Sequence, residues 1–186
     1  MKKLSLLLLL CTLIFATSCN DDETNPGETV LRYDNGEDTG PLLPAGINEA
    51  AVLFPASTMA EHVGKRLTQI EFLIGQQPAG ASVIVSGPGT DSQPGPIIYD
   101  ADVTNAIQIG EFSRHFLASP VTIDGTDLWI SVGVFHDAVQ QSIGCDSGPN
   151  VINGDWLFQE TDNTWQTFTD RTNESINWNI RGILEE

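Results

Sequence analysis

The sequence has 186 residues, of which 25 are Asp or Glu and only 8 are Lys or Arg, so its formal net charge is −17 at pH 7. A surface this acidic disfavours nucleic acids and anionic membranes as partners, because both carry charge of the same sign. The same charge is compatible with neutral glycans, calcium and basic protein surfaces, or with a role in solubility alone.

Residues 1–18 have the pattern of a secretory signal peptide. Lys2 and Lys3 precede an apolar run from Leu4 to Ala16, which is too short for a permanent membrane-spanning helix. The letters A-T-S-C at 16–19 resemble the lipobox at which bacterial lipoproteins are cleaved and acylated. Cys19 is therefore the expected lipid-attachment residue, and its acyl chains would be the protein's attachment to the membrane.

Residues 19–28 are predicted to form an acidic flexible tether, because the stretch after Cys19 contains no apolar residue with which to fold. An acidic cluster directly after the lipidated cysteine is similar to the surface-export signal of Bacteroidetes lipoproteins, and a solvated linker is the alternative. The expected location is the outer membrane, facing the cell exterior. Cleavage before Cys19 leaves six Lys and Arg against 25 Asp and Glu, a net charge near −19.

The remaining residues, 29–186, are predicted to form a single domain held together by its core. Cys11 leaves with the signal peptide and Cys19 carries lipid, so Cys145 has no cysteine with which to form an internal disulfide. About 160 residues are enough for one domain with a sizeable core.

The body consists of short segments rich in β-branched and aromatic residues, separated by turn signals such as Asn35-Gly36. A single helical turn is expected at 59–63. The predicted strands are 30–34, 49–54, 67–74, 82–86, 97–103, 107–117, 127–135, 156–160, 165–169 and 178–184. Roughly nine or ten short strands with regular turns predict an all-β sandwich of the jelly-roll type.

Five of these strands carry more specific expectations. Strand 67–74 alternates as a half-buried strand and is expected to pair with 82–86 through a Gly- and Pro-containing connection. Strands 156–160 and 165–169 are expected to form a hairpin. Strand 127–135 is the expected central strand, with Leu128, Ile130, Val132 and Val134 on one face and Trp129 and Phe135 on the other.

The long segment 136–154 separates the central strand from the hairpin and is predicted to be irregular. Loops of this length inside a compact domain are usually functional or disordered. Within this segment, Asp146 is expected to orient its loop by accepting hydrogen bonds from backbone N–H groups two residues further on.

A set of short motifs recurs in a recognisable order. They are Y-D-N-G (33–36), A-V-L-F-P (51–55), L-T-Q-I-E-F (67–72), P-G-P-I-I-Y (94–99), D-L-W-I-S-V-G (127–133), C-D-S-G-P (145–149), G-D-W (154–156), T-W (164–165) and N-W-N-I-R-G (177–182). Together they resemble the jelly-roll modules of secreted and surface proteins of the Bacteroidetes, including the cleaved-adhesin domains that accompany gingipain-like proteases. The resemblance implies an accessory, non-catalytic binding domain, often with structural calcium.

The acidic loop after the first strand is a candidate calcium site. Asp34, Glu37 and Asp38 offer three carboxylates within five residues, and calcium requires six to eight oxygen ligands. The spacing is not that of an EF-hand, and a polar hairpin turn is the alternative interpretation.

Trp165 is the candidate ligand-binding residue, because it follows a turn and aromatic rings bind sugars through their apolar faces. Trp129 and Trp178 lie in strands and are expected in the core, whereas Trp156 is open to either role. Glycan is one expected ligand class, and a surface protein is the other.

Catalytic motifs are missing from the sequence: neither G-x-S-x-G nor H-E-x-x-H occurs. Cys145 follows His136 by nine residues, but no nearby cation is evident to lower the pKa of its thiol. The sequence therefore predicts a non-catalytic binding or adhesion lipoprotein that contacts a membrane only through its anchor. The alternatives are a glycan-acting hydrolase that uses a pair of carboxylates and a structural subunit of a surface complex.

Overall fold

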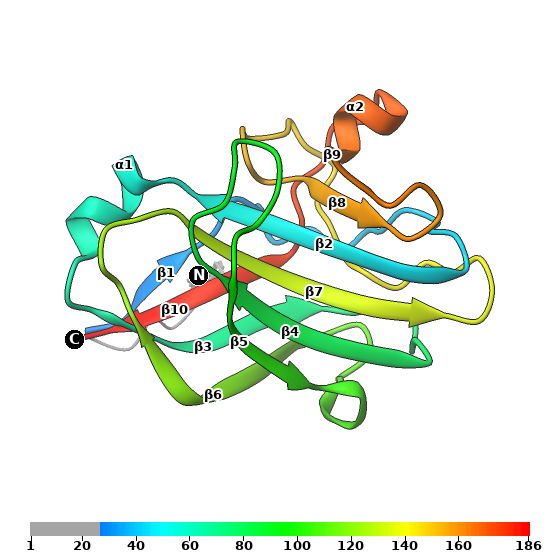
Figure 1. Ribbon diagram of the computed structural model, residues 1–186. Coiled ribbons are helices and arrows are strands. Elements are labelled where there is room, and N and C mark those ends of the chain that lie inside the picture. Colours follow the sequence, from blue (N-terminus) through cyan, green and yellow to red (C-terminus); the bar gives the residue numbers. More distant parts are fainter. Residues whose placement is uncertain (1–26) are drawn as a thin grey trace, which may run out of the picture.

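The computed structural model describes residues 27–186, which form two antiparallel sheets packed face to face (Figure 1). One sheet has the strand order β1-β10-β3-β6 and the other has the order β5-β4-β7-β2-β8-β9. The strands are β1 (Thr29–Leu31), β2 (Gly46–Phe54), β3 (Arg66–Leu73), β4 (Gly80–Ser86), β5 (Ile97–Asp102), β6 (Phe112–Thr122), β7 (Leu128–His136), β8 (Trp156–Gln159), β9 (Thr164–Thr167) and β10 (Ile180–Glu185). The helical segments are α1 (Ala56–Met59), α2 (Phe168–Thr172) and the 3-10 turns η1 (Ala60–His62) and η2 (Thr104–Ala106).

The pairing of the strands is nested. β1 pairs with β10, β2 with β7, β3 with β6, and β4 with β5, so that segments near the two ends of the domain meet and the inner strands pair inside them. This is the pairing of an eight-stranded jelly roll. The β8–β9 hairpin is an addition that extends the second sheet beyond β2. The predicted all-β sandwich and the predicted hairpin are both confirmed.

β7 lies between β4 and β2 and has the two-sided burial expected of a central strand. Leu128, Ile130, Val132 and Val134 contribute to the core between the sheets, whereas Trp129 belongs to a second, smaller cluster on the opposite face. The main core also contains Trp178, which is fully buried as predicted. Alternation along the strand therefore supplies two separate apolar clusters.

Two expectations about β3 are wrong. β3 does not pair with β4: it lies between β10 and β6, and β4 belongs to the other sheet. The connection between them crosses from one sheet to the other, which lets both strands bury an apolar face in the same core. β3 is also more than half-buried, because Gln69 and Glu71 on its polar face have little exposed surface. Glu71 tolerates this position because Arg114 donates to its carboxylate (Nε to Oε1, 2.8 Å).

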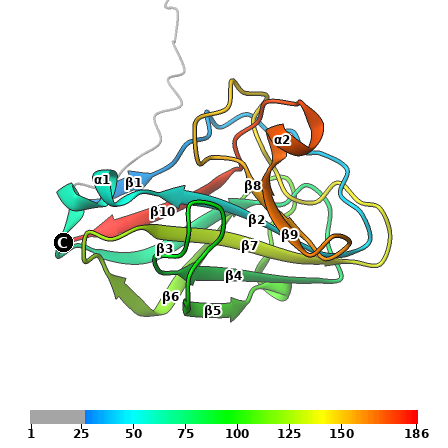
Figure 2. The same cartoon turned by 45° about the horizontal axis from the view of Figure 1, so that its top comes forward.

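The pairing of β1 with β10 brings Thr29 next to Leu184 at one end of the sandwich, which is also where α1 lies (Figure 1). The β8–β9 hairpin and α2 lie together away from that end (Figure 2). The segment 136–154 is irregular, as predicted, and isolated bridges tie it to the chain around Thr39 and Leu43 and to Trp178.

Candidate ligand-binding face

The face of the six-stranded sheet that points away from the other sheet is called the outer face here. Strand register assembles it from all six strands, because every second residue of each strand points to this side. One cross-strand row runs through Trp165, Phe158, Glu49, Gly133, Ser82 and Asp102. The next row runs through Thr167, Trp156, Ala51, Ser131, Ile84 and Asp100. The outer face therefore has aromatic residues on β8 and β9 and acidic residues on β5. Between them, on β2, β7 and β4, most of the residues are small, and Glu49 and Ile84 are the exceptions in these two rows.

A hollow of about 370 Å³ opens on this face, and its size lies in the range of small-ligand sites. We call it the Glu49 hollow; its lining includes Ile47, Glu49, Ser82, Asp100, Gly133 and Phe135. The floor is low because Gly133 has no side chain, and a Cβ there would lie only 3.1 Å from Ser82 Oγ. Ile47 and Phe135 form an apolar wall and are each 45% exposed.

Glu49 is half-buried in this hollow. Its burial raises the pKa of the carboxyl above the usual value of 4.5, the Ser131 hydroxyl opposes this shift, and the negative charge of Asp100 adds to it. No Lys, Arg or His of the described chain forms an ion pair with Glu49. The carboxylate therefore lies in a partly desolvated site without a counter-ion.

The aromatic side of the outer face is a packed cluster. The ring of Trp129 lies 5.5 Å from that of Trp156 and 6.1 Å from that of Trp165, and the Phe158 ring lies 5.7 Å from Trp165, each pair being tilted. These are favourable aromatic geometries. Trp129 is fully buried beneath the cluster, as predicted, whereas Trp165 is half-buried and retains an exposed part.

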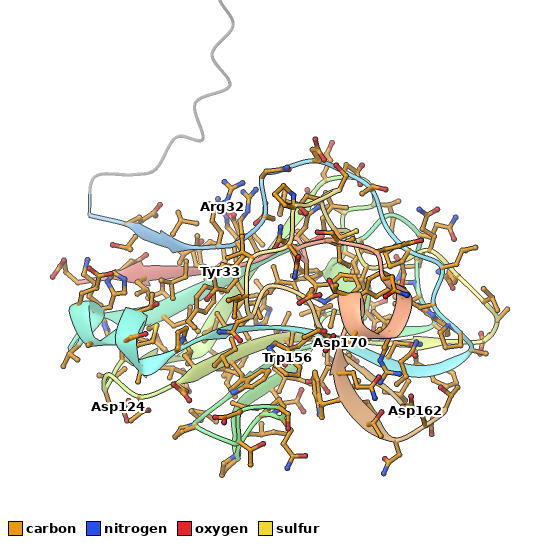
Figure 3. The ribbon with its side chains drawn as sticks, turned by 90° about the horizontal axis from the view of Figure 1, so that it is seen from above. Arg32, Tyr33, Asp124, Trp156, Asp162 and Asp170 are labelled. Carbon is orange, nitrogen blue, oxygen red and sulfur yellow. The ribbon has the colours of Figure 1, made fainter. Side chains whose placement is uncertain are left out.

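The hairpin that carries Trp165 is held by Arg171 of α2. Arg171 Nη2 donates to the Thr164 carbonyl oxygen at 2.8 Å, and Nη1 forms an ion pair with Asp162 Oδ2 at 2.5 Å. Arg171 is also the main reason why the pKa of Asp162 is lowered to about 2. Trp156 and Asp162 mark the two ends of this hairpin in Figure 3, on the opposite side of the sandwich from Arg32. These bonds fix the turn next to the aromatic cluster.

The three predicted calcium ligands have different surroundings. Asp34 is only 5% exposed and is held by Arg181 and Arg32. Glu37 accepts hydrogen bonds from the backbone N–H of Ser147, at 3.1 Å, and from its hydroxyl, and Asp38 is exposed. In residues 27–186, no three His, Cys, Asp or Glu side chains are grouped closely enough to hold a metal ion. The fold therefore does not bring the three carboxylates together as a metal site.

Asp146 orients its loop as predicted. Its Oδ1 accepts from the backbone N–H groups of Gly148 (2.9 Å) and Asn177 (2.8 Å), and its Oδ2 accepts from that of Asn35 (3.1 Å). A single buried carboxylate thus joins the segment after β1, the irregular segment and the approach to β10.

Cys145 and His136 are both buried and have different partners. Burial, with smaller contributions from Asp146, Glu174 and Asp38, raises the pKa of the Cys145 thiol to about 12. His136 Nε2 instead lies 2.5 Å from Ser142 Oγ, and burial lowers the pKa of this imidazole. A thiol with a pKa this high is not an activated nucleophile.

Trp165, the residue predicted from the sequence, lies on the outer face, whereas Glu49 was not among the predicted site residues. The signal was a glutamate in the strand-forming stretch E-A-A-V-L-F, where a charged side chain indicates a special environment. The signal peptide, Cys19 and most of the tether lie outside the described residues. Within 27–186, none of the helices has the length and apolar character needed to cross a membrane.

No protein-family model matches the sequence, and neither does any curated protein. Two solved structures resemble the fold. One is the clostridial cysteine protease Cwp84 after propeptide cleavage, with a TM-score of 0.61 and 10% identity over 87% of this chain and 41% of that chain. The other contains the cysteine protease and lectin-like domains of Cwp84, a surface-layer-associated protein of Clostridium difficile, with a TM-score of 0.53 and 10% identity over 87% of this chain and 37% of that chain. This chain thus spans about two fifths of each neighbour, and at this identity the likeness concerns the fold.

Proposed function

We propose that this protein is a non-catalytic binding module that recognises a glycan through its outer face. The observation that carries the proposal is the row Trp165–Phe158–Glu49, which places a stacking surface next to a carboxylate in a hollow. Aromatic rings offer an apolar face to a sugar ring, and a few convergent polar groups fix its orientation. Ile47 and Phe135 add apolar contact at the other end of the hollow.

Hydrolysis by a carboxylate pair fits the outer face less well. The raised pKa of Glu49 is typical of a general acid, but glycosidases place their two carboxyl groups about 5–10 Å apart across the scissile bond. Asp100 and Asp102 are on β5, three strands away from β2. The direct cross-strand neighbours of Glu49 are Phe158 and Gly133, neither of which offers a carboxyl group. The strand register therefore favours binding over cleavage.

We also propose that the module is displayed on the cell surface through a lipid on Cys19. The signal peptide and the A-T-S-C sequence support this location, as does the sequence resemblance to adhesin-type modules of the Bacteroidetes. A surface-layer-associated protein with a lectin-like domain among the structural neighbours supports the same setting. The acidic surface fits an uncharged glycan better than an anionic one.

The proposal is tested by a glycan array followed by calorimetry on the full chain purified in detergent. Trp165→Ala should weaken binding of the selected glycan at least about tenfold, because it removes the exposed part of the stacking surface. Gln166→Ala is the matched control, since Gln166 is the next residue of β9 and points to the opposite side of the sheet. Silence across the array would reject glycan binding and favour a protein partner.

A further inference from the structure

The Glu49 hollow has a charge pattern that is unusual for a site that takes only neutral sugars. Three carboxylates line it, those of Glu49, Asp100 and Asp102, and its lining includes no Lys, Arg or His. Asp100 and Asp102 are on the exposed edge strand β5, where water can solvate them. Glu49 lies on an interior strand and is half-buried, so water stabilises its charge less well.

The protein itself does not neutralise this charge. Two buried carboxylates of the sandwich have cationic partners: Asp34 is paired with Arg181, and Glu71 with Arg114. Two others, Asp146 and Asp155, accept hydrogen bonds from backbone N–H groups. In the described chain, Glu49 has no such ion pair, and the acidic residue whose charge it feels, Asp100, has the same sign. A partly desolvated carboxylate that lacks a counter-ion favours a ligand that brings one.

The aromatic side chains and the Glu49 carboxylate are close enough for a single sugar ring to contact both. Phe158 is the direct cross-strand neighbour of Glu49, and Trp165 is the direct neighbour of Phe158. Directly opposed side chains lie about 5 Å apart at their Cβ atoms. A pyranose ring stacked on the aromatic side can therefore bring a ring substituent to the Glu49 carboxylate.

We infer that the Glu49 hollow binds the ammonium group of an amino sugar, with Glu49 as its counter-ion and Phe158 and Trp165 as the stacking surface. This inference rests on the proposed glycan-binding function and adds the class of sugar. An acetylated amine carries no charge and cannot form an ion pair with Glu49. Uronic acids and sulfated sugars are disfavoured, because three carboxylates of the same sign face them.

The test compares three ligands that share one backbone: β-1,4-linked tetramers of glucosamine, N-acetylglucosamine and glucose. Calorimetry on the full chain in detergent should show the glucosamine tetramer binding at least about tenfold more tightly than the other two. Its affinity should fall as sodium chloride is raised, since salt screens the ion pair, whereas the neutral tetramers should respond little.

Glu49→Gln should remove the preference for glucosamine and leave the three affinities within about threefold of one another. Glu61→Gln is the matched control, because it makes the same chemical change at an exposed residue of η1 that is not part of the hollow. Equal binding of the charged and acetylated tetramers by the unmodified protein would overturn the inference, as would a preference that survives Glu49→Gln.

The array separates failure of this inference from failure of the proposed function. Binding of neutral glycans that depends on Trp165, with no preference for free amines, would reject the ammonium site and keep the glycan-binding face. No binding to any glycan, charged or neutral, would reject both. A thermal melt of Glu49→Gln confirms that the variant is folded.

Discussion

Asp34 and Arg181 form a buried ion pair between residues that are 147 positions apart in the sequence, with Arg181 Nη2 donating to Asp34 Oδ1 at 2.7 Å. Arg181 Nε also donates to Asp34 Oδ2 at 3.1 Å, and the guanidinium lies 3.9 Å from the centre of the Phe112 ring. The pair joins the segment after β1 to β10. It therefore adds an ion pair to the backbone hydrogen bonds by which β1 and β10 already pair.

Arg181→Met should destabilise the fold by about 3 kcal/mol, because it leaves Asp34 buried with only the more exposed Arg32 to balance it. Chemical denaturation measures the change. Lys65→Met is the control: Lys65 pairs with the exposed carboxylate of Glu186 at 3.1 Å, and its loss should cost less than about 1 kcal/mol. Equal losses for the two variants would show that the Asp34 pair contributes no more than a surface pair.

Glu49→Gln should stabilise the protein at neutral pH. The folded state holds the Glu49 proton more tightly than the unfolded chain does, so above about pH 4.5 the unfolded state binds fewer protons than the native state. The free energy of unfolding therefore falls as pH rises from the usual value of this carboxyl through its raised pKa. Melting temperatures at several pH values should show that the difference between the variant and the unmodified protein changes in favour of the variant as the pH rises over this range. A constant difference would contradict the assigned shift.

The Cys145 thiol should resist alkylation at pH 8 while the protein is folded. Burial leaves it 2% exposed, and a pKa of about 12 keeps it protonated. Labelling followed by peptide mass spectrometry should detect little modification of Cys145 in native buffer and complete modification in denaturant. Rapid labelling of the native protein would instead reveal local opening of the irregular segment.

Cys19→Ala should move the protein from the membrane fraction to the soluble fraction, because the acyl chains are the proposed anchor. Immunoblots of fractionated cells give the measurement. Cys145→Ala removes a thiol from the body instead and should stay with the membrane. Retention of Cys19→Ala in the membrane fraction would refute lipid anchoring.

The sequence was sufficient to predict the fold class and the approximate positions of the strands, because those depend on local patterns. It did not predict α2, which begins inside the predicted strand 165–169, and β6 begins at Phe112 and not at residue 107. Alternation in β7 separates Trp129 from Ile130 in any sheet that contains this strand. Which strands pair is a different question. The connection from β3 to β4 has the composition of a hairpin turn. In the structure, however, β10 and β6 pair with the two edges of β3, so the connection crosses to the other sheet.

The site was predictable only in part, for the same reason. Trp165 could be singled out by its place after a turn, but Glu49 became a site residue through its registration with Phe158 on one side and Gly133 on the other. Asp34 is the converse case. Its local acidic neighbours indicated a metal ligand, whereas the group that balances its charge, Arg181, is close to the other end of the chain.

The nested strand order also constrains when this chain can fold. β10 lies between β1 and β3, so the four-stranded sheet cannot form until nearly the whole polypeptide is present. Such long-range pairings make folding slow, because the chain loses the entropy of a large loop before the stabilising contacts between the strands form. If the chain is exported from its N-terminus, as proposed, the four-stranded sheet can be completed only after β10 has reached the far side of the membrane.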